Sequence, residues 1–155
     1  PSIQPELLEE NEYLYQRFLR PDGRDDIIKF LEEKNILPTS MIDISDGLSS
    51  ELIHLGKQSR MGMRIYEDKL PLHPSTVRVA EELNMEPITC ALSGGEDYEL
   101  LFTVSPAHFE ALAKHSEISI IGHVTSAQET FELVSKSDTI FNLRAQGWES
   151  YGSDS

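Results

Sequence analysis

Apolar residues recur along this chain at two spacings, one typical of helices and one typical of strands. In helical segments they return every three or four positions, so that one face of the helix is apolar. This spacing predicts helices at residues 5–20, 25–34, 47–55, 75–83 and 106–115. Turn-forming residues follow the first two of them, at 21–23 and at Asn35 and Pro38, and predict where these helices end.

Strands are predicted where short apolar runs, or alternating apolar and polar residues, stand between turn-forming residues. The segments that meet this description are 41–44, 62–66, 98–104, 118–124, 131–134 and 139–143. The last two flank residues 135–138 and predict an antiparallel hairpin, whereas the alternation of helices and strands before them favours parallel neighbours. The pattern predicts an α+β fold, an α/β sandwich in which a mixed β-sheet has helices packed on it.

Composition and charge limit what such a fold could do. The 155 residues are enough for one well-cored domain, and 39% hydrophobic with 26% charged residues is ordinary for a globular protein. The formal net charge of −14 opposes binding to the backbone of nucleic acids, so we expect no nucleic-acid partner. A substrate that carries phosphate would need metal cations between it and this acidic surface.

Cysteine content and hydropathy bear on where the protein works. Cys90 is the only cysteine, so the chain can form no internal disulfide and no multi-cysteine zinc site, which suits a reducing compartment. No apolar run approaches the roughly 20 residues that span a bilayer, and the N-terminus lacks the pattern of a signal peptide. We expect a cytoplasmic protein with no membrane partner. Because the sequence begins with Pro1 and not with Met, we expect a piece of a longer polypeptide.

An acidic turn, DISDGL at residues 43–48, joins a predicted strand to a predicted helix. It places the carboxylates of Asp43 and Asp46 and the hydroxyl of Ser45 near a helix N-terminus, where free N–H groups and the helix dipole favour an anion. Carboxylate oxygens are natural ligands of Mg²⁺, which completes its shell with water and phosphate oxygens. This corner can hold both Mg²⁺ and phosphate. Alternatively, Ser45 or Asp46 only caps the helix, and spacing alone leaves both interpretations open.

Two further candidates follow along the chain. The segment SGGEDYEL at residues 93–100 has paired glycines, which allow close approach of the backbone to a ligand, and acidic residues that could bind metal. A helix that ends at Gly94 explains the same letters. Trp148, the only tryptophan, could stack on a heteroaromatic ligand or pack in the core. The histidines show no metal-ligand spacing, and the chain has no P-loop and no nucleophile constellation.

Taken together and in order, the segments at 41–48 and 91–104 resemble the thiamine-monophosphate kinase family. The letters RFLRP at 17–21, IGHVT at 121–125 and the glycine before Trp148 support the resemblance, which covers nearly the whole chain. It implies the aminoimidazole ribonucleotide synthetase-like fold. It also implies that residues 1–155 are a single domain, the C-terminal half of a two-domain protein whose N-terminal domain is absent.

The same resemblance implies an activity and a set of site residues. Members of the family phosphorylate thiamine monophosphate to thiamine diphosphate with ATP as co-substrate and Mg²⁺ as cofactor. Asp43 and Asp46 resemble Mg²⁺ ligands, and Ser45 resembles an ATP contact. Glu96 and Trp148 resemble substrate contacts. No residue is assigned as a catalytic base, because phosphoryl transfer depends mostly on positioning and electrostatic stabilisation.

The family's N-terminal domain supplies most of the other metal and nucleotide ligands and the usual dimer contact. The resemblance therefore implies a homodimer for the full-length protein and little or no activity for this chain alone. Two alternatives stay open: another synthetase or kinase of the same superfamily, and a noncatalytic acidic binding module. The intact segment at 93–100 disfavours the first, and the intact acidic turn disfavours the second.

Overall fold

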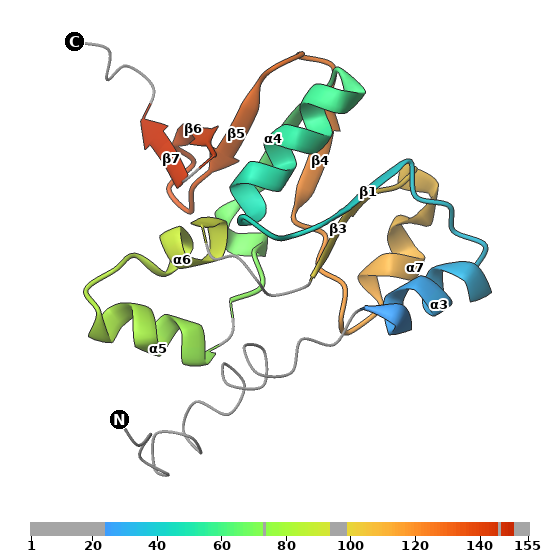
Figure 1. The fold of residues 1–155 in the computed structure, drawn as a ribbon, viewed down its shortest axis with the longest axis horizontal. Coiled ribbons are helices and arrows are strands. Elements are labelled where there is room, and N and C mark those ends of the chain that lie inside the picture. Colours follow the sequence, from blue (N-terminus) through green and yellow to red (C-terminus); the bar gives the residue numbers. More distant parts are fainter. Residues whose placement is uncertain (1–23, 73, 94–98, 146, 151–155) are drawn as a thin grey trace.

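The structure of the chain is a computed structural model, shown in Figure 1. It describes residues 24–72, 74–93, 99–145 and 147–150. The helix predicted at residues 5–20 and the candidate residue Glu96 lie outside these ranges. Within them the chain forms two β-sheets with helices packed on both.

The larger sheet is mixed, with the strand order β4-β2-β5-β6-β7. Its strands are β2 (Gly62–Tyr66), β4 (Gly122–Thr125), β5 (Phe131–Val134), β6 (Ile140–Arg144) and β7 (Gly147–Ser150). β2 and β5 are parallel, and the other neighbouring pairs are antiparallel. The mixed sheet is therefore confirmed, and the predicted hairpin is the antiparallel pair of β5 and β6.

A separate two-stranded sheet carries the acidic turn. It consists of β1 (Ser40–Asp43) and β3 (Leu100–Thr103), which run antiparallel with Asp43 opposite Leu100. The alternating pattern of helices and strands favoured parallel neighbours, and for this pair that expectation is wrong. β2 and several helices lie between the two strands in the sequence, and so long a connection allows either direction.

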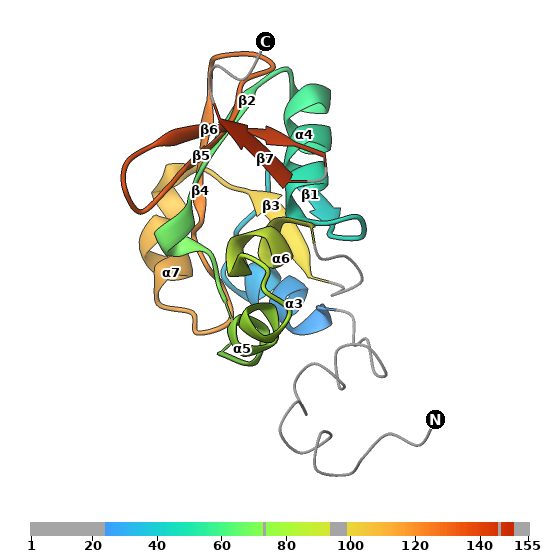
Figure 2. The ribbon, with the colours of Figure 1, turned by 90° about the vertical axis from the view of Figure 1, so that its left-hand side faces the viewer.

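Helix α4 (Leu48–Ser59) covers one face of the larger sheet, as Figures 1 and 2 show. Leu52 and Leu55 of α4 belong to the same buried cluster as Ile65 of β2, and each of the three is at most 4% exposed. The other helices are α3 (Asp25–Glu33), α5 (Pro74–Glu82), α6 (Pro87–Ser93) and α7 (Phe109–Ala113), with 3-10 turns η1 (Glu67–Lys69) and η2 (Pro106–His108).

A second, smaller cluster fills the space between α3 and α7. It contains Ile27 and Leu31 of α3 and Leu112 of α7, each 3% exposed. Along β3, Leu101 belongs to the first cluster and its neighbour Phe102 packs against the second. Successive side chains of a strand point to opposite faces, so the two-stranded sheet lies between the two cores. The acidic turn thus starts from a strand pair that is packed on both faces.

Most predicted elements occur close to their predicted places. α3 begins at the predicted residue, and β2 has the predicted bounds of 62–66. Helix α6, which ends at Ser93, matches the helix ending at Gly94 that the sequence left open as an alternative, whereas strand β7, which carries Trp148, was not predicted. None of the described helices is both long and apolar enough to cross a membrane.

Candidate functional site

Asp43 and Ile44 of the first motif lie beside Glu99 and Leu100, the described end of the second motif, at one end of the two-stranded sheet. Asp43 ends β1 and pairs with Leu100. One residue further along, the N–H of Ile44 donates to the carbonyl oxygen of Glu99 with an N···O distance of 2.8 Å. Glu99 belongs to the second candidate motif. The antiparallel pairing of β1 and β3 therefore brings the acidic turn next to the last two residues of the second motif, a contact that the sequence did not predict.

A buried carboxylate, that of Glu51 in the first turn of α4, holds the acidic turn. Glu51 is 3% exposed. Its Oε1 atom accepts a hydrogen bond from the Ser45 hydroxyl at 3.0 Å. The same oxygen accepts from the backbone N–H of Ser45 at 3.4 Å and of Asp46 at 3.3 Å. Backbone N–H groups in a turn have no ladder partner, so here the Glu51 side chain supplies the acceptor.

Neither Ser45 nor Asp46 caps helix α4, although the sequence left that possibility open. The N-cap residue is Gly47, and no side chain caps the helix through a hydrogen bond. Gly47 has φ of 109° and ψ of 153°, a backbone conformation that essentially only glycine adopts. The turn therefore depends on glycine at this position and on Glu51, and the residues 45–46 are left to another role.

Replacing Gly47 by Ala is expected to destabilise the protein by about 1–3 kcal/mol, because the added Cβ is strained at this positive φ. Urea denaturation monitored by circular dichroism measures the effect. His54→Ala, on the exposed side of the same helix, is the matched control and should stay within about 0.5 kcal/mol of the parent. Equal stability of the Gly47→Ala variant and the parent would contradict the backbone conformation described here.

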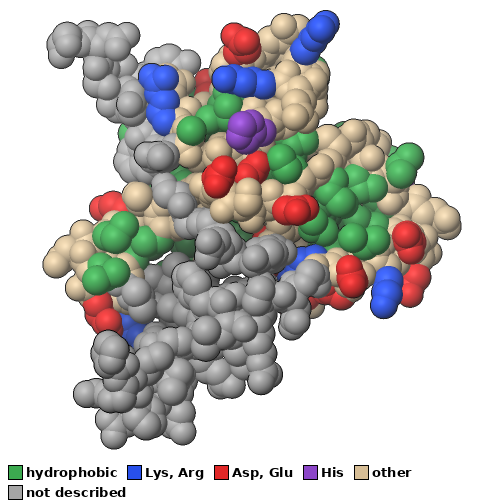
Figure 3. Space-filling view, viewed as in Figure 1, with side chains coloured by type: hydrophobic (Ala, Val, Ile, Leu, Met, Phe, Trp, Pro, Cys, Tyr) green, Lys and Arg blue, Asp and Glu red, His purple; other side chains and the backbone are tan. Residues whose placement is uncertain are grey.

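Asp43 and Asp46 present their carboxylates at the surface. Within the described part of the chain, neither carboxylate makes a hydrogen bond or ion pair, so their oxygens are accessible to a cation. Figure 3 shows acidic side chains on this face near the place where β1 leads into α4. Mg²⁺ takes one or two carboxylates and otherwise water and phosphate oxygens. The donor set at this turn therefore fits a Mg²⁺ ion that also binds a phosphate.

This donor set is small. The described residues contain no group of three or more His, Cys, Asp or Glu side chains that could hold a metal ion. The acidic turn itself offers two carboxylates, those of Asp43 and Asp46. A complete site for several cations needs ligands from elsewhere.

The two candidate substrate contacts are placed differently. Glu96 lies outside the described residues. Trp148 stands on β7, in register with Leu143 of β6. β7 lies next to α6, and α6 leads directly into the segment that carries Glu96. The strand with Trp148 and the start of the second motif are therefore neighbours in the fold.

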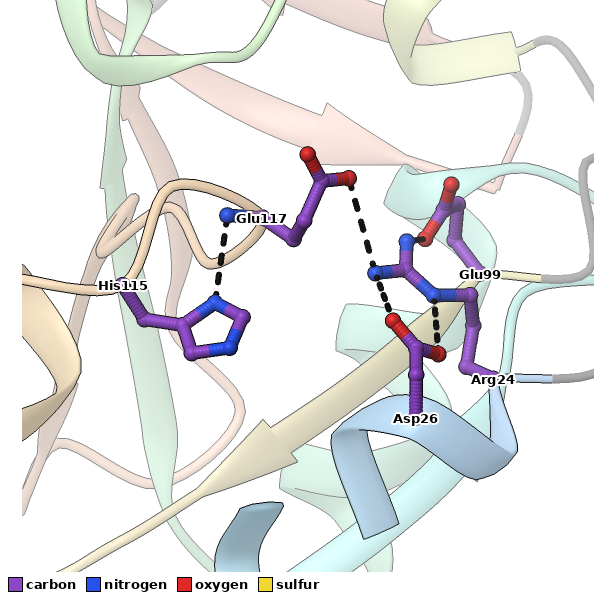
Figure 4. Close-up of polar contacts among 5 residues, drawn as sticks. All are labelled: Arg24, Asp26, Glu99, His115 and Glu117. Carbon is purple, nitrogen blue, oxygen red and sulfur yellow. Dashed lines mark hydrogen bonds and ion pairs between the residues drawn. The ribbon is translucent and has the colours of Figure 1, made fainter. Parts of the chain in front are cut away.

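Arg24, a residue to which the sequence analysis assigned no role, binds three carboxylates (Figure 4). Its guanidinium donates to Glu99 at 2.7 Å and makes two hydrogen bonds of 3.1 Å to Asp26. The carboxylate of Glu117 lies 3.7 Å away, and the Arg24 side chain is only 11% exposed. The hydrogen bond from Arg24 holds the pKa of the Asp26 carboxyl below its usual value of 3.8. Arg24 thus ties α3 to Glu99, the residue that bonds Ile44.

Arg24→Met is expected to destabilise the protein by about 1–3 kcal/mol, because three carboxylates then lose a shared, poorly exposed cation. Urea denaturation at pH 7 measures the loss. Because the pKa of Asp26 is lowered in the folded state, its contribution is present above pH 3.8 and disappears as pH falls through the lowered pKa. The difference between variant and parent should therefore shrink on acidification. The side chain of Asp26 is 58% exposed, so the Asp26→Asn variant should lose less than about 1 kcal/mol of folding free energy.

Glu51 and Arg24 are the residues that the sequence analysis missed. Glu51 follows the N-cap Gly47 by four residues and not by the three of a capping box, so its spacing gave no recognised signal. Arg24 offered no local signal, since its partner Glu99 is 75 positions away in the sequence.

Comparison with known proteins places this geometry in a family. No family model matches the chain. It is 35% identical over 131 residues to the thiamine-monophosphate kinase of Aquifex aeolicus, a match that covers 81% of this chain and 41% of the relative. It is 43% identical over 101 residues to the thiamine-monophosphate kinase of Escherichia coli, covering 65% of this chain and 30% of the relative.

Solved structures agree with the sequence matches. The thiamine monophosphate kinase of Aquifex aeolicus superposes with a TM-score of 0.68 at 31% identity, covering 85% of this chain and 41% of that one. The structure of AaThiL complexed with AMPPCP and TMP gives 0.70 at 28% identity, covering 97% and 43%. The hydrogenase maturation protein HypE of E. coli, with a TM-score of 0.64 at 20% identity over 77% of this chain and 39% of that one, shares the fold.

The fold is thus the aminoimidazole ribonucleotide synthetase-like α+β fold that the sequence implied. The chain spans well under half the length of the curated relatives that it matches. On shared motifs and fold, and with sequence identities of 35% and 43% to two curated relatives, the chain is a homologue of the thiamine-monophosphate kinases.

Proposed function

We propose that this chain is the C-terminal domain of a thiamine-monophosphate kinase, an enzyme that transfers the γ-phosphoryl group of ATP to thiamine monophosphate. Residues 1–155 form that single domain, and an N-terminal domain of the same polypeptide completes the site. The observation that carries the proposal is the hydrogen bond from Ile44 to Glu99, which joins the two family motifs at one end of the two-stranded sheet. A homologue crystallised with AMPPCP and TMP supports both ligands for this chain.

In this proposal the acidic turn binds the cation and the nucleotide. Asp43 and Asp46 hold Mg²⁺, and Ser45 contacts ATP. A Mg²⁺ ion held there would supply positive charge to offset the negative charge of the phosphates. Asp43 is oriented by its place in the strand pair, and Asp46 by the bond of its N–H to Glu51. The backbone at both residues is therefore held before a ligand arrives.

Glu96 and Trp148 bind thiamine monophosphate in this proposal. Trp148 offers a planar ring suited to stacking on a heteroaromatic group. The neighbouring positions of β7 and α6 support this assignment, because they bring the two stretches of chain together. No residue of the described chain needs to act as a nucleophile, since direct transfer depends on alignment of the two phosphates.

The proposal also accounts for the charge of the chain. With a formal net charge of −14, the chain repels two anionic ligands unless cations lie between them. Those cations are Mg²⁺ ions, and the N-terminal domain contributes the further residues that bind them. We expect the full-length protein to be a cytoplasmic homodimer, with no nucleic-acid or membrane partner.

A coupled assay tests the proposal. The polypeptide that carries this chain together with its N-terminal domain is incubated with ATP, Mg²⁺ and thiamine monophosphate, and thiamine diphosphate is measured by chromatography. Formation of thiamine diphosphate and ADP in equal amounts is expected. Turnover only with a different phosphate acceptor would assign the protein to another member of the superfamily. Absence of any ATP-dependent transfer would favour a noncatalytic binding module.

A further inference from the structure

Two glutamates of the described chain are buried, and they are satisfied in different ways. Glu132 of β5 is 7% exposed and pairs with Arg64 of the neighbouring strand β2. Glu51 is 3% exposed and, in the described part of the chain, forms no ion pair with a basic side chain. Its partners are the donors of Ser45 and Asp46. Glu51 is therefore buried against the acidic turn itself.

Burying a carboxylate is costly unless hydrogen bonds replace its water. For Glu51 three donors converge on Oε1, two of them backbone N–H groups of consecutive residues. Consecutive N–H groups that share one acceptor fix the path of the backbone at that point. The arrangement therefore constrains residues 45 and 46, which carry the proposed ATP contact and the second proposed Mg²⁺ ligand.

We propose that Glu51 is a positioning residue for the nucleotide and metal corner. It holds the turn in the conformation that presents the Asp46 carboxylate and the Ser45 oxygen to Mg²⁺ and ATP. The inference rests on the function proposed above. It extends that function to a residue in the core which touches neither ligand and acts through the turn.

The backbone of each proposed metal ligand is then held by a different interaction. Asp43 is fixed by the pairing of β1 with β3, where it lies opposite Leu100. Asp46 lies beyond the last paired residue, so strand pairing does not fix it; its N–H is bound by Glu51. Loss of Glu51 should therefore release Asp46 and Ser45 while Asp43 stays in place.

Glu51 acts here as a hydrogen-bond acceptor and not as a ligand. Its Oε1 is occupied by three donors, and the side chain is removed from solvent. The amide oxygen of glutamine has the same reach and also accepts hydrogen bonds. Gln at this position should therefore retain the turn, whereas Met, of similar length but without an acceptor, should not.

The test compares Glu51→Met and Glu51→Gln in the full-length polypeptide. For Glu51→Met, kcat/KM for Mg²⁺–ATP is expected to fall about 100-fold, the size of effect that a displacement of about 1 Å produces. KM for thiamine monophosphate should change less than about threefold, because the described donors to Glu51 belong to Ser45 and Asp46 of the nucleotide and metal corner. Glu51→Gln should stay within about tenfold of the parent, losing only the part of the bonds that charge contributes.

Amide hydrogen exchange gives a second readout that does not depend on turnover. In the Met variant the amides of Ser45 and Asp46 should exchange faster than in the parent, while those of β2 keep their protection. In the Gln variant both amides should stay protected. Glu132→Gln is the matched control: it weakens a buried ion pair in the sheet and should leave kcat/KM for Mg²⁺–ATP within about twofold of the parent.

Two outcomes would overturn the inference. The first is a folded Met variant whose affinity for AMPPCP and Mg²⁺ and whose exchange at residues 45–46 equal those of the parent. The second is a Gln variant that loses as much as the Met variant, which would assign the function to the negative charge. If the Met variant does not fold, the Gln variant decides alone. If the parent makes no thiamine diphosphate, the proposed function fails, and amide exchange still tests the contact.

Discussion

Asp43→Ala in the full-length enzyme is expected to lower kcat/KM at least about 100-fold, the range seen when one preorganised electrostatic contact to a transferring group is removed. Asp43 lies at the end of β1 with an exposed carboxylate, directly beside the backbone bond that joins the two motifs. Its side chain makes no hydrogen bond or ion pair within the described residues. The loss should therefore fall on Mg²⁺ and nucleotide binding and not on the fold.

Steady-state kinetics over a range of Mg²⁺ concentrations measures this prediction, together with a thermal melt. The folding free energy of the variant should stay within about 0.5 kcal/mol of the parent, as is usual for an exposed position. Asp43→Asn keeps the size of the side chain and removes its charge, so it should lose activity as well. Asp68→Ala, at an exposed aspartate of η1, is the control and should turn over normally. Unchanged turnover of Asp43→Ala at saturating Mg²⁺ would remove Asp43 from the site.

The 155-residue chain alone is expected to produce no measurable thiamine diphosphate. Two anionic ligands must approach a chain with a net charge of −14, and the described residues contain no cluster of three or more potential metal ligands. The relatives that it matches are more than twice as long. In the proposed function, an N-terminal domain helps to hold the cations, and without them the repulsion between the phosphates is not compensated.

A direct comparison settles this second prediction. The chain alone, the full-length polypeptide, and the chain mixed with a separately produced N-terminal domain are assayed with ATP, Mg²⁺ and thiamine monophosphate. Activity is expected in the full-length protein, and partial recovery in the mixture would indicate that the two domains assemble. Robust turnover by the chain alone would show that the two-carboxylate turn suffices and that the proposed division of the site between domains is wrong.

Some elements could be predicted from the residue pattern of their own segment. β2 alternates apolar and polar residues because one of its faces packs under α4, so its bounds were predicted from the sequence. Helix α3 was predicted from its apolar stripe, which includes Ile27 and Leu31, the two buried residues of the helix. The acidic turn was also recognised from its own letters, together with the second motif and the family that both indicate.

Relations between distant residues could not be predicted in this way. The pairing of β1 with β3 depends on two cores that pack on opposite faces of β3, and no single stretch of sequence contains both. Helix α6 and strand β7 are short, and their periodicity is too brief to distinguish them from loops.

The acidic turn therefore owes its chemistry to the sequence and its geometry to the tertiary structure. Residue types and order alone indicated carboxylates and a hydroxyl at a strand-to-helix corner, and a resemblance that implies Mg²⁺ and ATP as the ligands of that corner. Only the fold showed that Ser45 and Asp46 bond to buried Glu51, and that Arg24 holds Glu99 beside Ile44. The physical reason is that a hydrogen bond requires two groups to meet within about 3 Å, and for distant residues only packing decides which groups meet.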